Sequence, residues 1–166
     1  TGDMLLKESV AIGDDETASE LHDRLSAVGA ELLIKTISAI KVGTITREKQ
    51  EDSLSNYASM ITKDMCPIDF SLPAQQVHNK IRGLSASPCA VTMLNGKRLK
   101  IFKSTMSDKK KYDLAAGTVV NEKDFTVVCG DGYTLTFTEV QSEGGKRMKV
   151  SDFLRGNHIE KGICLN

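Results

Sequence analysis

Apolar residues recur at helical spacing through the first third of the chain. The repeat consists of Leu21, Leu25, Val28, Leu32, Leu33, Ile37 and Ile40. Thr17 and Glu20 have the spacing of a capping box, and Gly43 follows the last apolar position as helix-ending glycines do. The pattern predicts one amphipathic helix between Thr17 and Gly43. Residues 4–12 ahead of it predict a strand, so that strand and helix form half of an α/β unit.

A second, shorter apolar repeat follows a less regular stretch. Residues 44–72 show no sustained period and are expected to form an inter-domain connection on the surface. Ser71 is expected to begin the next helix, with Pro73 in its first turn. The apolar face of that helix consists of Val77, Ile81 and Leu84, and the side chains off the face are His78, Lys80 and Arg82.

After Pro88 the apolar period changes to two, which is typical of strands. The expected strands are Ala90–Leu94, Lys97–Met106, Gly117–Asn121, Asp124–Cys129 and residues 133–138, followed by a short helix at 151–154. Asn95-Gly96 joins the first two and is a strong signal for a hairpin turn. Five short strands in so few residues favour a small closed barrel, because closure removes exposed strand edges. Among such barrels the OB-fold is a common nucleic-acid binder.

Charge is divided unevenly along the chain. The 22 Lys and Arg residues balance the 22 Asp and Glu residues. Residues 1–70, however, carry 7 basic and 13 acidic side chains, whereas residues 71–166 carry 15 and 9. The net charge is therefore −6 in the first part and +6 in the second. This asymmetry indicates a nucleic-acid or membrane contact confined to the second part.

The basic residues of the second part are concentrated between Lys80 and Lys111, where nine cations accompany one acid, Asp108. Phosphate backbones attract such clusters through counterion release. Arg98, Lys100 and Phe102 alternate onto one face of the second strand, as residues that contact an oligonucleotide would. Two alternatives remain open: lysines decorate many surfaces, and a bulge would return Phe102 to the core. We favour RNA binding because of the uneven charge.

Other features exclude several classes of protein. The chain is 40% hydrophobic and 27% charged, which is typical of a folded protein. No apolar run approaches the ~20 residues that span a bilayer, so no membrane contact through a spanning helix is expected. The first residue is Thr1 and no signal peptide follows, so we expect a piece of a longer protein.

The candidate ligands for a metal do not cluster. Cys66, Cys89, Cys129 and Cys164 are widely spaced, so four reduced, mostly buried thiols in a cytoplasmic protein are expected and no metal site. The three histidines are interpreted as surface residues, without a paired nucleophile or carboxylate. The acidic residues 14–16 lack the spacing of a calcium loop and are expected to favour the start of the helix that follows.

Several segments resemble one family in the same order. They are residues 1–6, 17–25, 57–58, 62–63, 68–71 and 74–84, the last with the sequence Ala-Gln-Gln-Val-His-Asn-Lys-Ile-Arg-Gly-Leu. These segments are similar to methionyl-tRNA formyltransferase, from the end of its catalytic domain through its linker to its C-terminal domain. One departure is residues 85–90, where the family usually has a tryptophan before the proline. The resemblance otherwise covers nearly the whole chain.

The resemblance implies an α+β chain in three parts. Residues 1–56 would be the remnant strand and helix of a Rossmann-like formyltransferase domain, and residues 57–72 a linker. Residues 73–166 would be a five-stranded OB-like β-barrel with flanking helices that binds tRNA. The family transfers a formyl group from 10-formyltetrahydrofolate to the amino group of methionyl-initiator tRNA in translation initiation. No metal and no obligate protein partner are implied.

The family's catalytic asparagine, histidine and aspartate have no counterparts here. The aspartate immediately precedes the motif that Thr1 begins, and Asp3 matches a second, non-catalytic acid. The folate-binding loop is also expected upstream, so the chain should be inactive alone. What the resemblance carries over is a basic tRNA-binding surface, matched by Lys63, Lys80, Arg82, Arg98 and Lys100. Lys63 and Lys80 lie in matched motifs, whereas Arg98 and Lys100 follow from charge alone.

Two other functions are compatible with these residues. One is the hydrolase part of a 10-formyltetrahydrofolate dehydrogenase, which shares the architecture, although residues 1–4 and the intact basic barrel favour the transferase. The other is a stand-alone, non-enzymatic RNA-binding OB module with a helical extension.

Overall fold

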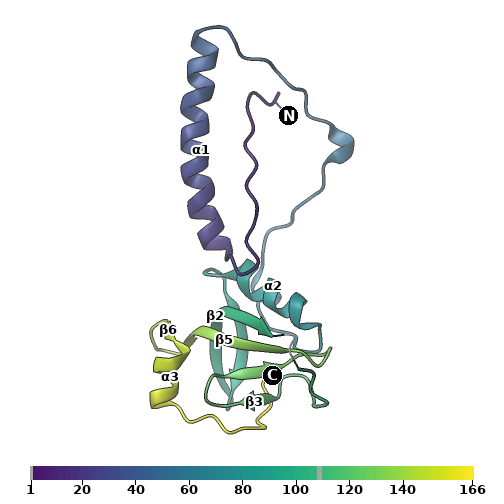
Figure 1. Cartoon of the computed structure of the whole chain (residues 1–166), viewed down its shortest axis with the longest axis vertical. Helices are drawn as coiled ribbons and strands as arrows, with labels where there is room; N and C mark the ends of the chain where they lie inside the picture. The colour runs from purple at the N-terminus through teal and green to yellow at the C-terminus, as the bar shows by residue number, and fades with distance from the viewer. Residues whose placement is uncertain (1, 108–109) are drawn as a thin grey trace. The chain divides into compact units, whose positions relative to one another are not determined.

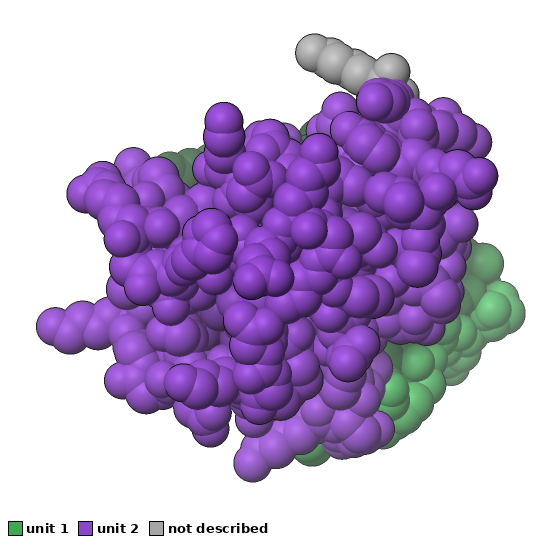
Figure 2. Space-filling view, turned by 90° about the horizontal axis from the view of Figure 1, so that it is seen from below, with its two compact units in different colours: residues 1–14, 19–60 green, residues 15–18, 61–166 purple. Residues whose placement is uncertain are grey.

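The computed structural model describes residues 2–107 and 110–166. The chain divides into two compact units, coloured separately in Figure 2. Unit 1 comprises residues 1–14 and 19–60, and unit 2 comprises residues 15–18 and 61–166. Helices and antiparallel strands are both present, so the predicted mixture of α and β structure is confirmed.

The long helix α1 (Ala18–Lys41) confirms the first predicted helix (Figure 1). Gly43 follows it with φ +74°, a conformation that favours glycine at a helix end. No residue of α1 is buried: Val28 and Leu32 are half-buried, while Leu25 and Ile37 are each 44% exposed. The amphipathic pattern therefore predicts the helix correctly, although only part of its apolar face is covered.

The strand predicted at residues 4–12 is wrong. The segment has no strand assignment, and only Met4 forms a bridge, to Glu48. Lys7 adds an exposed ion pair with the Glu48 carboxylate, 2.8 Å away. A strand needs a neighbour to pair its backbone groups, and the described residues of unit 1 supply one only at Met4. The apolar composition alone does not provide that neighbour.

The helical elements of unit 2 ahead of its sheet are the 3₁₀ turn η2 (Lys63–Met65) and the helix α2 (Ala74–Leu84). The other 3₁₀ turn, η1 (Asp52–Leu54), belongs to unit 1. The predicted apolar face of α2 is confirmed, because Val77, Ile81 and Leu84 are all buried. The helix starts three residues after the predicted Ser71, whose hydroxyl instead donates to Asp69. Asp131 accepts the Ala74 amide at 3.2 Å and so caps α2 from a distant turn.

The sheet of unit 2 has six strands, in the order β1-β2-β5-β4-β3, with β6 beside β5. Their bounds are β1 Ala90–Leu94, β2 Lys97–Ser107, β3 Val119–Asn121, β4 Thr126–Val128, β5 Thr134–Ser142 and β6 Met148–Lys149. All these pairings are antiparallel. Asn95 (φ +51°) and Gly96 (φ +72°) form the predicted hairpin turn. β6 and the helix α3 (Val150–Gly156) complete the unit.

Residues 163–166 join the two outer strands of this sheet. The Val119 amide donates to the Ile163 carbonyl at 2.8 Å, and the Leu165 amide donates to Gly117 at 2.9 Å. On the other side, the Met93 amide of β1 donates to the Asn166 carbonyl at 2.8 Å. The segment therefore occupies the edges that β3 and β1 would otherwise expose.

The core of unit 2 lies inside this curved sheet. α2 packs against β2, and α3 against β5 (Figure 1). Phe125 and Phe137 meet edge to face with centroids 5.1 Å apart, and Phe153 of α3 stacks on Phe125 at 6.3 Å. Leu99 and Ile101 of β2 point into this core, which fixes the outward direction of their neighbours along the strand.

Candidate nucleic-acid interface

Arg98 and Lys100 lie together on the outer face of β2. They alternate with Leu99 and Ile101, which are buried, so the strand period directs the two cations away from the core. Lys100 pairs in register with Gln141 of β5. The structure thus confirms that this strand presents two cations side by side to solvent.

Both cations line a shallow groove of about 230 Å³, called the β2–β5 groove below. Its lining residues are Arg98, Lys100, Gln141, Ser142, Glu143 and Gly144. Two cations, an amide and a hydroxyl suit a phosphate and sugar backbone, and Glu143 is the one acidic side chain among these lining residues. The Glu143 amide donates to the Arg98 carbonyl at 3.1 Å, which fixes the loop against β2.

Phe102 does not lie on this face as an open stacking surface. The register of β2 against β5 shifts between Ile101 and Lys103, and Phe102 is only 6% exposed. The bulge that the sequence left open as an alternative for Phe102 is therefore present. A bulge inserts an extra residue, so Ile101 and Phe102 are both buried although they are adjacent.

Arg147 is a member of this surface that the sequence analysis missed. Its guanidinium lies 4.5 Å from the centroid of the Phe102 ring, and it is ion-paired with Glu139. Arg147 lies far beyond the basic cluster Lys80–Lys111 in the sequence. It comes close to β2 only because distant strands pair in the fold. Its pairing with Glu139 also reduces the positive charge that it offers to a ligand.

Lys63 and Lys80 lie apart from the groove residues. Lys63 is exposed in η2. Lys80 is half-buried, and its Nζ donates to the Pro67 carbonyl at 2.5 Å. Pro67 in turn pairs with Val91, whose partner across β1 and β2 is Lys100. The backbone at Pro67, which anchors Lys80, therefore lies two strand spacings from the backbone of Lys100, with β1 between them. Two strand spacings are roughly 10 Å.

Arg82, Lys110 and Lys111 make contacts within unit 2. Arg82 Nε donates to Asn79 at 2.8 Å and its Nη1 donates to the Glu16 carbonyl at 3.2 Å. Lys110 and Lys111 lie over the rings of Tyr112 and Tyr133, at 4.8 and 4.7 Å. Asp108 and Lys109 lie outside the described residues. Of the predicted site residues, the structure thus brings only Arg98 and Lys100 together.

His78 is buried, which contradicts its interpretation as a surface residue. Only 2% of it is exposed, and its Nδ1 lies 3.0 Å from the Ser104 hydroxyl. Its Nε2 lies 3.2 Å from a carboxylate oxygen of Asp15. The polar partners on both ring nitrogens make this burial possible, and they come from distant parts of the sequence. His22 and His158 are exposed, as predicted.

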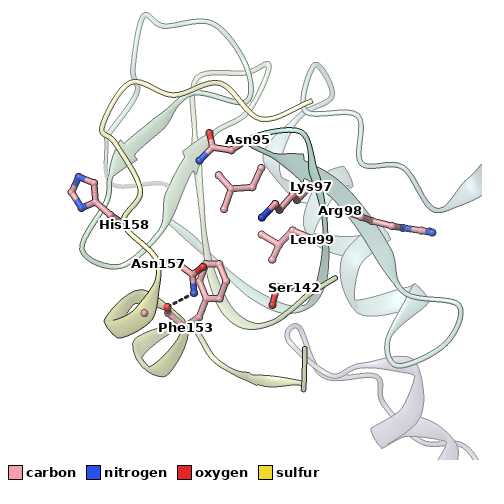
Figure 3. A pocket seen from close by; sticks show the side chains of 10 residues that line it. Asn95, Lys97, Arg98, Leu99, Ser142, Phe153, Asn157 and His158 are labelled. Atoms are coloured by element: carbon pink, nitrogen blue, oxygen red, sulfur yellow. Dashed lines mark hydrogen bonds between the residues drawn. The ribbon is translucent and has the colours of Figure 1, made fainter. Parts of the chain in front are cut away.

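A cavity of about 290 Å³ lies beside the β1–β2 turn and is called the hairpin cavity below (Figure 3). Its walls include Leu94, Leu99 and Phe153, and its polar lining includes Asn95, Lys97 and Asn157. Arg98 and Ser142 line both this cavity and the β2–β5 groove, so the two hollows adjoin. No local pattern in the sequence indicates this cavity, because its residues come from β1, β2 and the turn between them, from β5, and from α3 and the residues after it.

Residues 2–107 and 110–166 contain no group of three or more His, Cys, Asp or Glu side chains placed to hold a metal ion. No helix in the same residues is long and apolar enough to cross a membrane. All four cysteines are free; three of them are buried, as predicted for most of the thiols, whereas Cys164 is exposed.

Similarity to solved structures supports the fold. The sugar 3N-formyl transferase WlaRD, solved in the presence of dTDP and 5-N-formyl-THF, matches 88% of this chain and 51% of its own, with a TM-score of 0.64 and 22% identity. HypX from Aquifex aeolicus in complex with tetrahydrofolic acid matches 92% of this chain and 27% of its own, with a TM-score of 0.68 and 15% identity. At these identities the likeness concerns the fold alone.

Sequence similarity is much closer to another group of proteins. The methionyl-tRNA formyltransferase of Geobacter metallireducens is 45% identical over 99% of this chain and 52% of that protein. The chain thus spans about half the length of the curated relatives it matches, and the predicted resemblance is confirmed. The model of the formyl transferase C-terminal domain matches residues 60–158, which include α2 and the whole sheet. The chain therefore belongs to the formyl transferase C-terminal domain family.

Proposed function

We propose that this chain is the tRNA-binding part of a methionyl-tRNA formyltransferase. The parent enzyme would transfer a formyl group from 10-formyltetrahydrofolate to the amino group of methionyl-initiator tRNA, in the cytoplasm. The observation that carries the proposal is the 45% identity to a protein of that name over 99% of the chain. A dehydrogenase hydrolase part is not favoured by this similarity.

The domain organisation is part of the proposal. Residues 1–56 would close the catalytic domain as a remnant of its Rossmann-like fold, residues 57–72 would be the linker, and residues 73–166 would be the tRNA-binding domain. The bridging of β1 and β3 by residues 163–166 supports an OB-like barrel for the last part, because it joins the two ends of the sheet.

The groove suggests how tRNA would be held. Arg98 and Lys100 would contact consecutive phosphates along the β2–β5 groove, with Lys63 and Lys80 extending the contact across η2 and α2. Arg82 would act mainly by orienting the start of the chain segment at Glu16, to which it is bonded. Phosphate contacts fix position and orientation without reading sequence.

The folate donor does not fit the hairpin cavity next to this surface. The hairpin cavity, at about 290 Å³, lies at the lower limit of the roughly 300–1,000 Å³ typical of small-molecule sites. Its lining contains no carboxylate to pair with the amino-pyrimidine edge of a pterin. No chemical step of formyl transfer is therefore assigned to residues of this chain.

The proposal is tested by the salt dependence of tRNA binding. Affinity for initiator tRNA should fall with salt, and each phosphate contact adds roughly 0.7–0.9 to the slope of log affinity against log salt. The double variant Arg98→Gln/Lys100→Gln should reduce the slope by the amount expected for two phosphate contacts, roughly 1.4–1.8. The matched control Lys35→Gln/Lys41→Gln removes two exposed cations of α1 and should leave the slope nearly unchanged.

An unchanged slope in the groove variant would show that Arg98 and Lys100 do not contact phosphates. For the parent activity, the full-length protein should formylate charged initiator tRNA. Breakdown of 10-formyltetrahydrofolate at a rate independent of tRNA would instead support a hydrolase.

A further inference from the structure

We propose that the hairpin cavity binds one unstacked nucleobase of an RNA strand whose phosphates lie on the β2–β5 groove. The assignment of an RNA strand to the groove rests on the proposed function, whereas the assignment of the base site rests on the shape and lining of the cavity. The two hollows share Arg98 and Ser142, so a strand that follows Arg98 and Lys100 passes the mouth of the cavity.

The cavity offers the side chain of Leu94 to the ring of a base. Leu94 is half-buried, whereas Leu99 and Phe153 line the cavity with only 2% of each exposed and so give no open stacking surface. Unpaired bases in RNA are recognised in this way, by apolar contact with the ring and polar contact with its edge. A volume of about 290 Å³ favours a single ring system over an extended ligand.

Two amides at the cavity are positioned for the edge of a base. Asn157 Nδ2 donates to the Phe153 carbonyl at 2.9 Å, which orients the amide and leaves its oxygen as the acceptor it presents. The backbone of Asn95 is fixed in the hairpin turn with φ +51°, and its amide offers a donor and an acceptor to a base edge. Because the Asn157 amide is oriented before binding, its ordering cost is small.

Charge favours a ligand that carries a phosphate. In Figure 3 the Lys97 side chain points into the cavity, whereas Arg98 and His158 point away from it. The residues that line the cavity include no Asp or Glu. A nucleotide would therefore place its phosphate between Lys97 and the groove, with its base against Leu94.

Gly156 provides a variant that fills the cavity with little strain. It lines the cavity, and a Cβ built on it meets nothing within 4 Å. Gly156→Leu should therefore occlude the cavity without altering the groove. Gly29→Leu is the matched control, because Gly29 is also helical with no atom within 4 Å of an added Cβ and lies in α1.

The experiment compares a uridylate octamer with an abasic octamer of the same charge, on the 166-residue chain. The wild type and Gly29→Leu should bind the base-bearing strand at least about tenfold more tightly, from base contacts of the usual strength. Gly156→Leu should bring the ratio near one and leave the salt slope unchanged. Side-chain amide resonances of Asn95 and Asn157 should shift on binding in the wild type only for the base-bearing strand.

Each other outcome overturns a separate statement. Equal affinity of the wild type for the two octamers would refute the base site and leave the groove assignment standing. No binding of either octamer or of tRNA would refute the proposed function itself. If free uridine monophosphate shifts the Asn95 and Asn157 resonances but the octamers bind equally, the cavity takes a free nucleotide and its assignment to a base of the RNA strand is wrong.

Discussion

His78 connects three distant segments of unit 2 through its two ring nitrogens. Ser104 belongs to β2, His78 to α2, and Asp15 to the residues before α1. A histidine next to lysine and arginine in a helix is an ordinary surface pattern, so the sequence favoured exposure. Ser104 lies 26 positions after His78 and Asp15 lies 63 positions before it, and no local pattern reveals them as partners.

Two buried cysteines should make stability depend on pH in the alkaline range. Burial raises the pKa of Cys89 from 9.0 to about 11 and that of Cys129 to about 12. Their folded pKa values lie above the unfolded value, so the stability they contribute is complete below pH 9 and is lost as pH rises through about 11. The free energy of unfolding should therefore fall between pH 9 and 11.

Urea unfolding at pH 8 and pH 10 measures this effect. Other groups titrate in the same range, so the comparison is with Cys89→Ala/Cys129→Ala, whose decline between the two pH values should be smaller. Equal declines in the wild type and the double variant would rule out the buried thiols as the cause.

At the scale of elements, local sequence signals correctly predicted the helices and the hairpin that local interactions stabilise. The helices α1 and α2 and the Asn95-Gly96 hairpin follow from spacing and turn residues, and all three are present. β6 and residues 163–166 carry no such signal, because each is held by pairing with strands far away in sequence. The groove was predictable only as far as Arg98 and Lys100, since Arg147 and the hairpin cavity depend on tertiary packing.

The start of α2 depends on a carboxylate from another turn. Asp131 accepts the amides of both Ala74 and Tyr133 at 3.2 Å. Asp131→Ala should lower the free energy of unfolding by about 1 kcal/mol, the usual cost of a lost N-cap. Asp131→Asn retains an acceptor and should recover part of the loss.

Thermal or urea unfolding measures this difference, with Asp152→Ala as the control. Asp152 forms an exposed pair with Arg155 three residues along α3, and such pairs contribute little. A stability of Asp131→Ala equal to that of the wild type would mean that solvent replaces the cap without cost.

For the whole molecule, closure of the sheet depends on residues 163–166. Deleting them should expose the β1 and β3 edges and remove the buried Leu165, a side chain whose burial is worth roughly 1.5–3 kcal/mol. The urea midpoint should fall, and amide exchange should accelerate at Met93 and Val119, which donate to this segment. Asn166→Ala retains the backbone acceptor and should leave Met93 protected. Continued protection of Met93 after the deletion would contradict the bridging role.

The charge of the whole chain is also unevenly distributed. The net charge is zero, but residues 1–70 are acidic and residues 71–166 are basic. The basic part coincides with most of unit 2, where the groove and the hairpin cavity lie. Solubility and association rates of the chain should therefore reflect local fields and not the net charge.

The position of the bridging segment has a consequence for synthesis on the ribosome. Translation proceeds from the N-terminus, so residues 163–166 are made after every strand that they join. Until they emerge from the exit tunnel, β1 and β3 lack their hydrogen-bonding partners and offer open edges to other nascent chains. Unit 2 is thus most prone to co-translational aggregation between the completion of β5 and the emergence of residues 163–166 from the exit tunnel.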